Sequence, residues 1–555
     1  MVPSGGGTPA MMDNASVLSR LNLYAKLGEL HDENPFKLRA FSSAAFNLKK
    51  IKQPFSEMKG EDLLALPGVG KSVVQAIQEL LEFQDFQALN ALVERTPSGV
   101  LGMLGLKGLG PKKVKALWQE HGVDSVEELL DACRENRLVE WSGFGSKTQA
   151  DLIKAIEFQM ASAGQVHFAR AYSLATKWLA NAQALGGQHA WSGPLARHCD
   201  TLEQLDFISD SSIRPLLDNE AWVVSEEANE FHWEDENGVR YRHRIVAPDQ
   251  FDRELFESSS EGSHLQQLGY DSTKWAGSER ETYERLGKSY IPVWQREGRG
   301  EFEYVQGTPI AFEHLRGTLH NHTQYSDGLN SLQEMAKATA ALGLDYFGVC
   351  DHSKTASYAG GLSVERLRQQ AAEVDQWNAQ PGNVRIFKGI ESDILLDGQL
   401  DYEDEVLAEL DFVVASIHAV LKMDLDRAMQ RLIRAIENPY TTILGHMTGR
   451  LLLMRSGYPV DHHRIIDACA HNGVAIEINA HPYRLDMDWR YIDYAQKKGV
   501  YLSINPDAHE QSGLKDMQWG VLSAAKGGLV KEFTLNALSL NEFSAYLEAQ
   551  KSKRP

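Results

Sequence analysis

The sequence predicts a multidomain protein with an all-α N-terminal region, an α+β middle region and a C-terminal α/β barrel. Three observations support this prediction. A chain of 555 residues is too long for a single hydrophobic core. Residues 13–160 consist of short helix-like segments separated by pairs of glycines. Residues 313–555 alternate apolar strand-like runs with helical stretches, which is the pattern of repeated βα units.

The composition is that of an ordinary soluble globular protein, with 43% hydrophobic and 24% charged residues. The net charge of −20 argues against a protein coated with basic surface for nucleic acid. The charge is unevenly distributed, however, because residues 1–170 hold 19 Lys and Arg against 20 Asp and Glu. The first third can therefore carry local basic patches, while the acidity is concentrated in the remainder of the chain.

Cysteine usage and hydropathy indicate a cytoplasmic protein. The four cysteines are far apart and form no CxxC pair, which fits a reducing compartment without disulfides. No run of about 18 apolar residues is present, so no membrane partner is expected. The first residues are rich in Gly, Ser, Thr and Pro and lack the regions of a signal peptide, so residues 1–12 are expected to be a disordered tail. No obligate protein partner is evident.

Three near-repeats in the helical region have the form apolar-x-Gly-apolar-Gly, followed by a lysine and a helical pattern. A single copy is more often an ordinary turn, but three copies predict helix-hairpin-helix binding of the DNA backbone without reading of sequence. The paired glycines allow a tight turn and close approach of a phosphate, and the lysine adds charge. The predicted DNA-binding residues are Gly68, Gly70, Lys71, Gly108, Gly110, Lys112, Gly143, Gly145 and Lys147.

Residues 34–41, which read Asn-Pro-Phe-Lys-Leu-Arg-Ala-Phe, together with the first two hairpins resemble the N-terminal region of bacterial family X DNA polymerases. The resemblance continues over residues 192–208. It implies two helix-hairpin-helix domains, at 13–95 and 96–160, and a nucleotidyltransferase-like palm and thumb with a linker at 161–312. In eukaryotic relatives a lysine beyond the first hairpin attacks an abasic sugar. The matching position here is Ala76, so this lyase chemistry is not expected.

In family X polymerases, two aspartates in an Asp-x-Asp strand and a third on a nearby strand hold two Mg²⁺ ions. The matching positions in this sequence are Gln204, Asp206 and Arg242. Glutamine offers only a neutral oxygen, and arginine places a fixed cation where the ions would sit. The sequence therefore predicts a degenerate polymerase site without nucleotide transfer, in which Asp206 has a structural role.

In residues 313–555, nearly every strand candidate ends in a potential metal ligand. The expected strands are 317–321, 346–350, 385–387, 412–416, 442–444, 474–478 and 501–504. A lone His-x-His such as His320 and His322 is more often incidental than a ligand pair. In βα barrels, however, the C-terminal strand ends meet on one face, so ligands at six strands in the same phase predict one metal site. The candidates at and just after these strand ends are His320, His322, Asp327, Asp351, His352, Glu391, His418, His446, Asp507 and His509.

This pattern resembles the PHP (polymerase and histidinol phosphatase) family of phosphoesterases, which implies a distorted (β/α)7 barrel over residues 313–555 with two or three divalent ions. The resemblance implies three ligand sets. They are His320, His322, Glu391 and Asp507; then Glu391, His418 and His446; then Asp327, His352 and His509. Mixed imidazole and carboxylate ligands favour manganese, with zinc or iron as alternatives. Asp351 and Arg484 are the candidate catalytic residues, the first for orienting the site or relaying a proton and the second for holding a phosphate. An ordinary surface ion pair is the alternative for Arg484.

These features predict a DNA-binding, metal-dependent phosphodiesterase. The expected activity is 3′→5′ exonuclease or end processing in DNA repair, at gaps, nicks or 3′ ends. Three alternatives remain at this point. One is a functional family X polymerase with exonuclease activity that fills gaps in base excision repair, which Gln204 and Arg242 oppose. Another is a small-molecule phosphatase of the histidinol-phosphate type, which leaves the hairpins unexplained. The last is a DNA-binding scaffold without catalysis.

Overall fold

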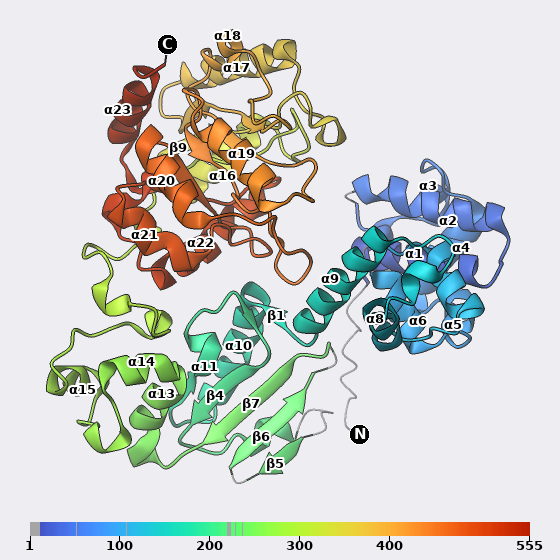
Figure 1. Cartoon of the computed structure of the whole chain (residues 1–555), viewed down its shortest axis with the longest axis horizontal. Helices are drawn as coiled ribbons and strands as arrows, with labels where there is room; N and C mark the ends of the chain where they lie inside the picture. The colour runs from blue at the N-terminus through green and yellow to red at the C-terminus, as the bar shows by residue number, and fades with distance from the viewer. Residues whose placement is uncertain are drawn as a thin grey trace, which may run out of the picture. The chain divides into compact units, whose positions relative to one another are not determined.

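The computed structural model describes residues 12–51, 53–106, 108–218, 224–227, 229–235 and 237–554. Residues 1–11 of the expected tail lie outside the described residues. The chain folds as two compact units, residues 1–163 and 164–555 (Figure 1). The finer domain limits stay predictions. Among the described residues, no helix combines the length and the apolar character needed to cross a membrane.

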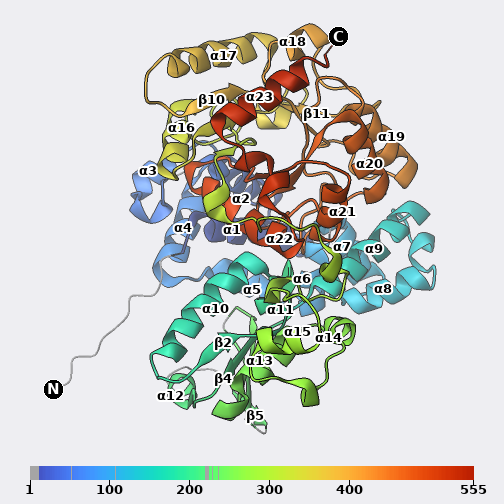
Figure 2. The same ribbon diagram turned by 90° about the vertical axis from the view of Figure 1, so that its left-hand side faces the viewer.

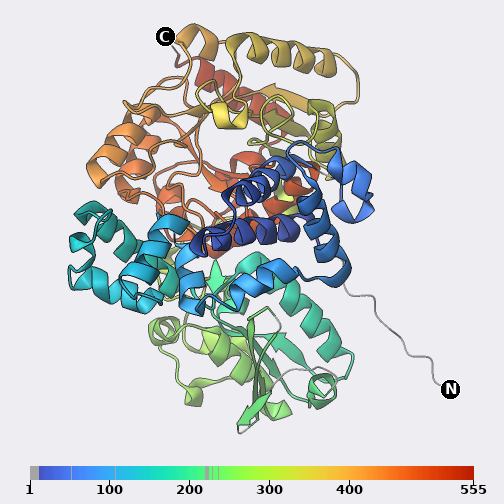
Figure 3. The same ribbon diagram turned by 90° about the vertical axis from the view of Figure 1, so that its right-hand side faces the viewer.

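The first unit is helical (Figure 3). Its helices surround a core of Leu, Val, Ala and Phe side chains. Short loops with local caps separate its helices. Asn34, for example, accepts a hydrogen bond from Phe36 N at 2.9 Å, and Pro35 occupies the first position of the helix that follows. The helices are α1 (Asn14–Leu30), α2 (Pro35–Asn47), α3 (Gly60–Leu64), α4 (Lys71–Phe83), α5 (Gln87–Val93), α6 (Ser98–Gly105), α7 (Pro111–Lys115), α8 (Val126–Arg134) and α9 (Ser146–Ser162).

The second unit begins with an α+β region built on a five-stranded sheet in the order β2-β4-β7-β6-β5. Helix α10 (Phe168–Gln183) covers one face of this sheet (Figures 1 and 2). Strands β4 and β7 are parallel neighbours, and their register places Asp206 opposite Arg242. The strands are β2 (His189–Trp191), β4 (Leu205–Ser209), β5 (Ser225–Glu227), β6 (Glu230–Glu234) and β7 (Arg240–Ile245). A pair of short strands, β1 (Val166–His167) and β3 (Thr201–Leu202), lies beside them, and the helices are α11 (Gly193–Ala196), α12 (Arg214–Leu217), α13 (Phe251–Ser259), α14 (Gly262–Leu268) and α15 (Glu279–Arg285).

The C-terminal region is the expected α/β barrel, with two parallel sheets in the orders β10-β9-β8 and β11-β12-β13-β14-β15. Single parallel bridges join the sheets, one between His352 and Glu391 and one between Asn321 and Ala508. Strand β11 continues β10 after a two-residue interruption, so seven strand paths close the barrel in its described residues. The strands are β8 (Gly317–Thr318), β9 (Tyr346–Val349), β10 (Arg385–Lys388), β11 (Glu391–Asp393), β12 (Val414–Ser416), β13 (Ile443–Leu444), β14 (Ala475–Asn479) and β15 (Leu502–Asn505).

The strands of the barrel are buried on both faces because helices cover them, which explains their almost continuous apolar sequences. Short strands leave their polar last residues at one end of the barrel, where the connecting loops begin. The helices are α16 (Leu332–Ala341), α17 (Val364–Asn378), α18 (Asp404–Leu407), α19 (Leu425–Ile436), α20 (His462–Asn472), α21 (Ile492–Lys497), α22 (Met517–Lys526) and α23 (Leu540–Lys551).

Helix α22 of the barrel also packs into the α+β region. Trp519 and Leu522 lie against the core of that region, and Trp519 forms an edge contact with the ring of Phe168. One turn further, the fully buried Lys526 donates to the backbone oxygen of Arg197 at 2.7 Å and to Glu297 Oε1 at 2.6 Å. Residues at positions i, i+3 and i+7 therefore turn one face of α22 toward the α+β region.

Candidate metal centre and hairpin turns

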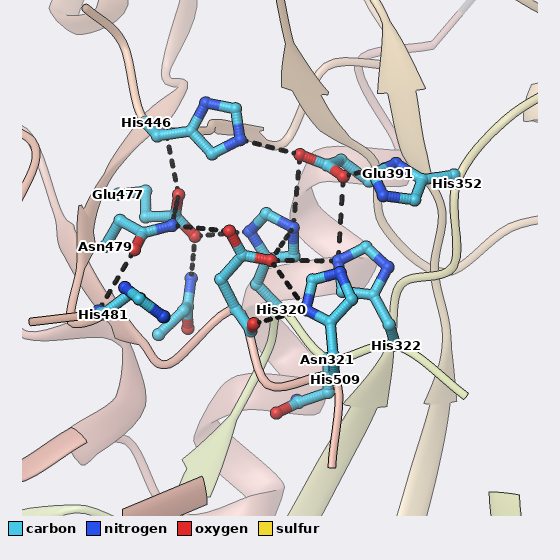
Figure 4. A network of polar contacts seen from close by, with 12 residues as sticks. His320, Asn321, His322, His352, Glu391, His446, Glu477, Asn479, His481 and His509 are labelled. Atoms are coloured by element: carbon cyan, nitrogen blue, oxygen red, sulfur yellow. Dashed lines mark hydrogen bonds and ion pairs between the residues drawn. The ribbon is translucent and has the colours of Figure 1, made fainter. Parts of the chain in front are cut away.

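The nine predicted metal ligands meet at one end of the barrel. They come from six strand ends, and Figure 4 shows six of them pointing toward a common centre: His320, His322, His352, Glu391, His446 and His509. The site has a closed side and an open side. His320 and His322 are fully buried, whereas the side chains of Asp327 and His509 are 35% and 40% exposed. A substrate therefore reaches the site past Asp327 and His509.

The carboxylate of Glu391 is at the centre of the cluster and is 1% exposed. Each of its oxygens faces imidazole nitrogens. Oε1 lies 3.0 Å from His446 Nε2, 3.1 Å from His418 Nε2 and 3.3 Å from His320 Nε2, and Oε2 lies 2.9 Å from His352 Nδ1. One carboxylate that faces four rings is suited to bridging two cations.

Two further carboxylates complete the cluster. Asp507 Oδ1 lies 3.0 Å from His322 Nε2 and 3.6 Å from His320 Nε2. Asp327 lies 3.6 Å from His352 Nε2 and 3.5 Å from His509 Nε2. Three overlapping sets have ligand atoms within 4.8 Å of one another: His322, Asp327, His352 and His509; His320, His322 and Glu391; and His352, Glu391 and His418. Compared with the expected division, His322 and His352 each belong to two sets.

The donor set fits divalent cations. Buried polar atoms are normally hydrogen-bonded, yet His320 Nε2, His322 Nδ1 and Glu391 Oε2 are buried here without a hydrogen bond among the described residues. An imidazole nitrogen and a carboxylate oxygen left in this state are the atoms that Mn²⁺, Zn²⁺ or Fe²⁺ coordinates.

The electrostatics keep the carboxylates ionised. Burial opposes the charge on Glu391, but His418, His320 and His352 outweigh it and hold the pKa of Glu391 well below its usual range. Burial, with His509 and His352 nearby, lowers the pKa of His322 to about 3, so its ring is neutral.

Two carboxylates outside the predicted ligand set orient ligand rings. His320 donates from Nδ1 to Glu477 Oε1 at 2.6 Å, which leaves Nε2 facing Glu391. His418 Nδ1 bonds Asp393 in the same way, with its Nε2 toward Glu391. A carboxylate on the far ring nitrogen fixes the tautomer and raises the basicity of the ligand atom.

Sequence reasoning missed both of these orienting carboxylates. Signals for them exist. Glu477 is the only charged residue within the apolar run of β14, and Asp393 follows Glu391 with the period-2 spacing that points two side chains to the same side of a strand.

Asp351 is fully buried beside the cluster, and most of its side-chain hydrogen bonds come from the loop that carries Asp327, with one more from Gln370 of helix α17. It accepts from Thr323 N at 2.8 Å, from Thr323 Oγ1 at 2.6 Å, from the backbone and hydroxyl of Ser326, and from Gln370 Nε2 at 2.5 Å. These contacts hold Thr323 and Ser326 in place, and the role of Asp351 in the site stays a prediction.

Arg484 stands at the edge of the cluster, where its Nε lies 3.7 Å from Asp507 Oδ2 and its side chain is 20% exposed. An arginine in this position offers further N–H groups to a phosphate at the ions. Arg484 therefore lies within reach of the cluster, and its role there stays a prediction.

The three predicted hairpin turns share one backbone conformation in the first unit. The first glycine of each has a positive φ, +79° at Gly68, +100° at Gly108 and +85° at Gly143, which only glycine adopts without strain. The second glycine (Gly70, Gly110 and Gly145) is the residue before helix α4, α7 or α9, and no side chain caps these helix starts.

The surroundings of the hairpin turns leave room for a ligand. A Cβ on Gly70, Gly110 or Gly145 would meet nothing within 4 Å. The lysines that follow, Lys71, Lys112 and Lys147, are exposed. The turns therefore offer free N–H groups and positive charge at an open surface, which suits a phosphate.

Family models match three parts of the chain: "Helix-hairpin-helix domain" at residues 12–85, "SAM-like Helix-hairpin-helix tandem" at 100–157 and "PHP domain" at 318–481. The DNA polymerase/3′-5′ exonuclease PolX of Bacillus subtilis is 34% identical over 97% of this chain and 100% of its own length. The chain belongs to the PolX family. A probable phosphatase of Acetivibrio thermocellus is 27% identical over 42% of the chain and 95% of its own length, and one of Thermoanaerobacter sp. is 26% identical over 42% and 95%.

The palm of this PolX chain places the three positions that matched the family's aspartates close together. Asp206, 2% exposed, accepts from Arg242 Nε at 2.8 Å and from Gln204 Nε2 at 2.8 Å. Burial raises the pKa of Asp206 in spite of Arg242.

Proposed function

We propose that this PolX chain is a metal-dependent DNA phosphodiesterase, a 3′→5′ exonuclease or end-processing enzyme of DNA repair, whose PHP site is its only catalytic centre. The observation that supports this most is the convergence of eight imidazole and carboxylate groups around the carboxylate of Glu391, including buried nitrogen and oxygen atoms without hydrogen bonds. The hairpin turns supply the second element of the proposal, a surface suited to DNA phosphates.

Each group of the chain has a role in this hydrolysis. Divalent ions held by the nine ligands would lower the pKa of a water molecule and offset the negative charge of the phosphate. Glu477 and Asp393 hold His320 and His418 with their Nε2 atoms toward the centre. Asp351 fixes the loop that carries Asp327. Arg484 binds a non-bridging phosphate oxygen and so positions the scissile bond at the open side.

Nucleotide transfer is not part of the proposal, although the relative from Bacillus subtilis is named as a polymerase as well as an exonuclease. Two Mg²⁺ ions need several anionic oxygens, and the three positions that match the family's aspartates offer one carboxylate, Asp206, which is already paired with Arg242. A small-molecule phosphatase is the second candidate, because two relatives named probable phosphatases match 42% of this chain over 95% of their own length. The hairpin turns favour DNA over that class of substrate.

One experiment separates these functions. The purified protein is incubated with a 5′-labelled primer–template and Mn²⁺, with and without nucleotides, beside a His320→Ala/His322→Ala variant and an EDTA control. Primer shortening that the variant and EDTA abolish supports the exonuclease. Extension that requires nucleotides would restore the polymerase reading. Hydrolysis of a small phosphomonoester by protein that leaves DNA intact would favour the phosphatase.

A further inference from the structure

The loop between β9 and α17 carries a tyrosine that the fold does not bury. Among the described residues of the second unit, Tyr358 is the most exposed large hydrophobic side chain, at 71%. It belongs to a single 3₁₀ turn, Ser357–Ala359. A lone exposed hydrophobic side chain is ordinary on a protein surface, so its surroundings decide whether it has a role.

The ring of Tyr358 lies beside the metal cluster. Its centre is 6.3 Å from the centre of the His352 ring. His352 belongs to the ligand set on the open side of the site, together with Asp327 and His509, and Figure 4 shows His352 and His509 pointing to the common centre. A substrate that enters past Asp327 and His509 would therefore meet the exposed ring.

The charged groups that shift the pKa of Tyr358 are those of the cluster and its edge. Partial burial and the carboxylates of Asp393, Glu391 and Asp327 raise this pKa, and Arg484 lowers it by less. The hydroxyl is therefore protonated at neutral pH. Tyr358 is thus an uncharged, flat group at the edge of a charged site, and it does not repel a phosphate held there.

The loop that carries Tyr358 is anchored on both sides of the ring. Before it, Thr355 donates from Oγ1 to Asp393 Oδ2 at 2.8 Å, and the same carboxylate orients a ligand ring. After it, Arg366 donates from Nη1 to the backbone oxygen of Gly360 at 2.9 Å. The ring is therefore presented to solvent by a fixed turn. A ring already held in place loses little conformational freedom when a ligand covers it.

The cluster and the ring match different parts of a nucleotide. Imidazoles and carboxylates with divalent ions bind a phosphate, whichever group is esterified to it. An aromatic side chain stacks on the face of any base, because every base has a π-face. A phosphodiester of DNA has a nucleoside on each side, so a phosphate at the cluster brings a base within one sugar of the edge where Tyr358 stands.

We propose that Tyr358 is a base-binding residue of the metal site, whose ring stacks on a nucleobase next to the scissile phosphate. The inference rests on the proposed function, because it takes a DNA phosphodiester as the substrate. It adds the means by which the site distinguishes a nucleotide from a phosphate ester that has no flat group.

The test uses three 5′-labelled single-stranded oligonucleotides of one sequence, digested by the full-length protein with Mn²⁺. One has all its bases, one has an abasic tetrahydrofuran unit as its 3′-terminal nucleotide, and one has this unit at the penultimate position. The two abasic substrates show on which side of the scissile phosphate the stacked base lies. The wild type should cleave one of them about tenfold less efficiently than the complete oligonucleotide, a typical effect of losing base stacking.

Tyr358→Ala should lose about tenfold in kcat/KM on the complete oligonucleotide, mainly through KM, because the ring binds the substrate. On the abasic substrate that the wild type cleaves poorly, the loss should be less than about twofold, since no base is there to stack. Tyr358→Phe and Tyr358→Trp should keep the wild-type kcat/KM, because both retain a flat ring. Metal content should be the same in all variants.

The matched control is Ser357→Ala, which changes the neighbouring exposed side chain in the same turn and should cleave all three substrates as the wild type does. A Tyr358→Ala variant that is unchanged on the complete oligonucleotide, or weakened equally on all three, overturns the proposal. A loss in Tyr358→Phe as large as in Tyr358→Ala also overturns it, because the hydroxyl would then be the group that acts. Wild-type protein that shortens none of the oligonucleotides overturns the proposed function, and the inference with it.

Discussion

Asp507 of the barrel and Asp206 of the palm are both buried carboxylates beside parallel strands, and their partners differ. Asp507 faces His322 and His320 at 3.0 and 3.6 Å, and these rings hold its pKa well below the usual range even though burial opposes its charge. Asp206 is bonded by Arg242 and Gln204, and burial raises its pKa.

The difference lies in what the partner does when a metal ion arrives. An imidazole loses its proton and becomes a ligand itself, so a carboxylate among histidines is ready for a cation. A guanidinium keeps its charge at any ordinary pH and has no lone pair to offer. A buried acid therefore indicates a metal site only when the groups around it can also bind the metal.

The largest effect should come from Glu391→Gln, because it removes the charge that faces four imidazoles. Exonuclease activity with Mn²⁺ should fall by more than about a hundredfold, since losing even an outer partner of a ligand costs about 10–100-fold. Metal content measured by mass spectrometry should fall with it. Asp206→Asn in the palm should retain activity within about twofold. If Asp206→Asn loses activity and Glu391→Gln does not, the view that the barrel holds the metal site and the palm does not is wrong.

A smaller effect is expected for Glu477→Gln, which removes the partner of His320 Nδ1 but no predicted ligand. Affinity for Mn²⁺ should fall by about 10–100-fold, as for other carboxylates that orient a metal-binding histidine. Titration of metal-free protein by calorimetry measures this, and activity should recover partly at high Mn²⁺. The exposed Glu548 provides a control in Glu548→Gln. Unchanged affinity in Glu477→Gln would mean that His320 needs no orientation.

Arg484→Ala should reduce kcat/KM on DNA by about tenfold while metal content stays constant. The reason is that a hydrogen bond to a charged group contributes about 1.5–3 kcal/mol. Steady-state kinetics on a labelled primer measure the change, and Arg490→Ala, which removes an exposed arginine paired with Asp488, is the control. Loss of bound metal in Arg484→Ala would instead assign the arginine to the support of Asp507.

Gln204→Asp should have the smallest effect, since it restores one palm carboxylate but leaves Arg242 beside Asp206. No primer extension is expected with Mg²⁺ or Mn²⁺ and nucleotides, and exonuclease activity should stay at the wild-type value. A gel assay of primer length shows both. Measurable synthesis by this single variant would refute the view that Arg242 blocks the palm.

Much of the fold follows from the sequence because apolar residues and glycines recur with a different spacing in each region. The barrel strands were predicted within a few residues, since apolar runs that end in His, Asp or Glu mark both the strand and its last residue. Strand β8 is shorter than expected, Gly317–Thr318, because the following residues turn into the site. The interruption between β10 and β11 was not predicted, since a break at Gly389 and Ile390 depends on which neighbouring strand each half pairs with.

The sequence predicted the candidate ligands, and it missed the carboxylates that orient them. Ligands at strand ends share a phase that the sequence displays. Glu477 lies inside a strand, and its importance appears only when His320, 157 residues away, is found 2.6 Å from it. Asp351 illustrates the same limit. The sequence shows only its neighbour His352, whereas the fold shows that its carboxylate accepts a hydrogen bond from Thr323, 28 residues away.

The face of α22 that carries Trp519, Leu522 and Lys526 limits how the barrel can be exchanged between proteins during evolution. A recombination break near residue 312 would separate the barrel from the α+β region. Trp519 and Leu522 would then lose the hydrophobic core that covers them, and Lys526 would lose its partner Glu297. The barrel is therefore not a freely exchangeable module in this lineage. Loss of the α+β region would expose this face of α22, so selection on the barrel alone would be enough to preserve that region.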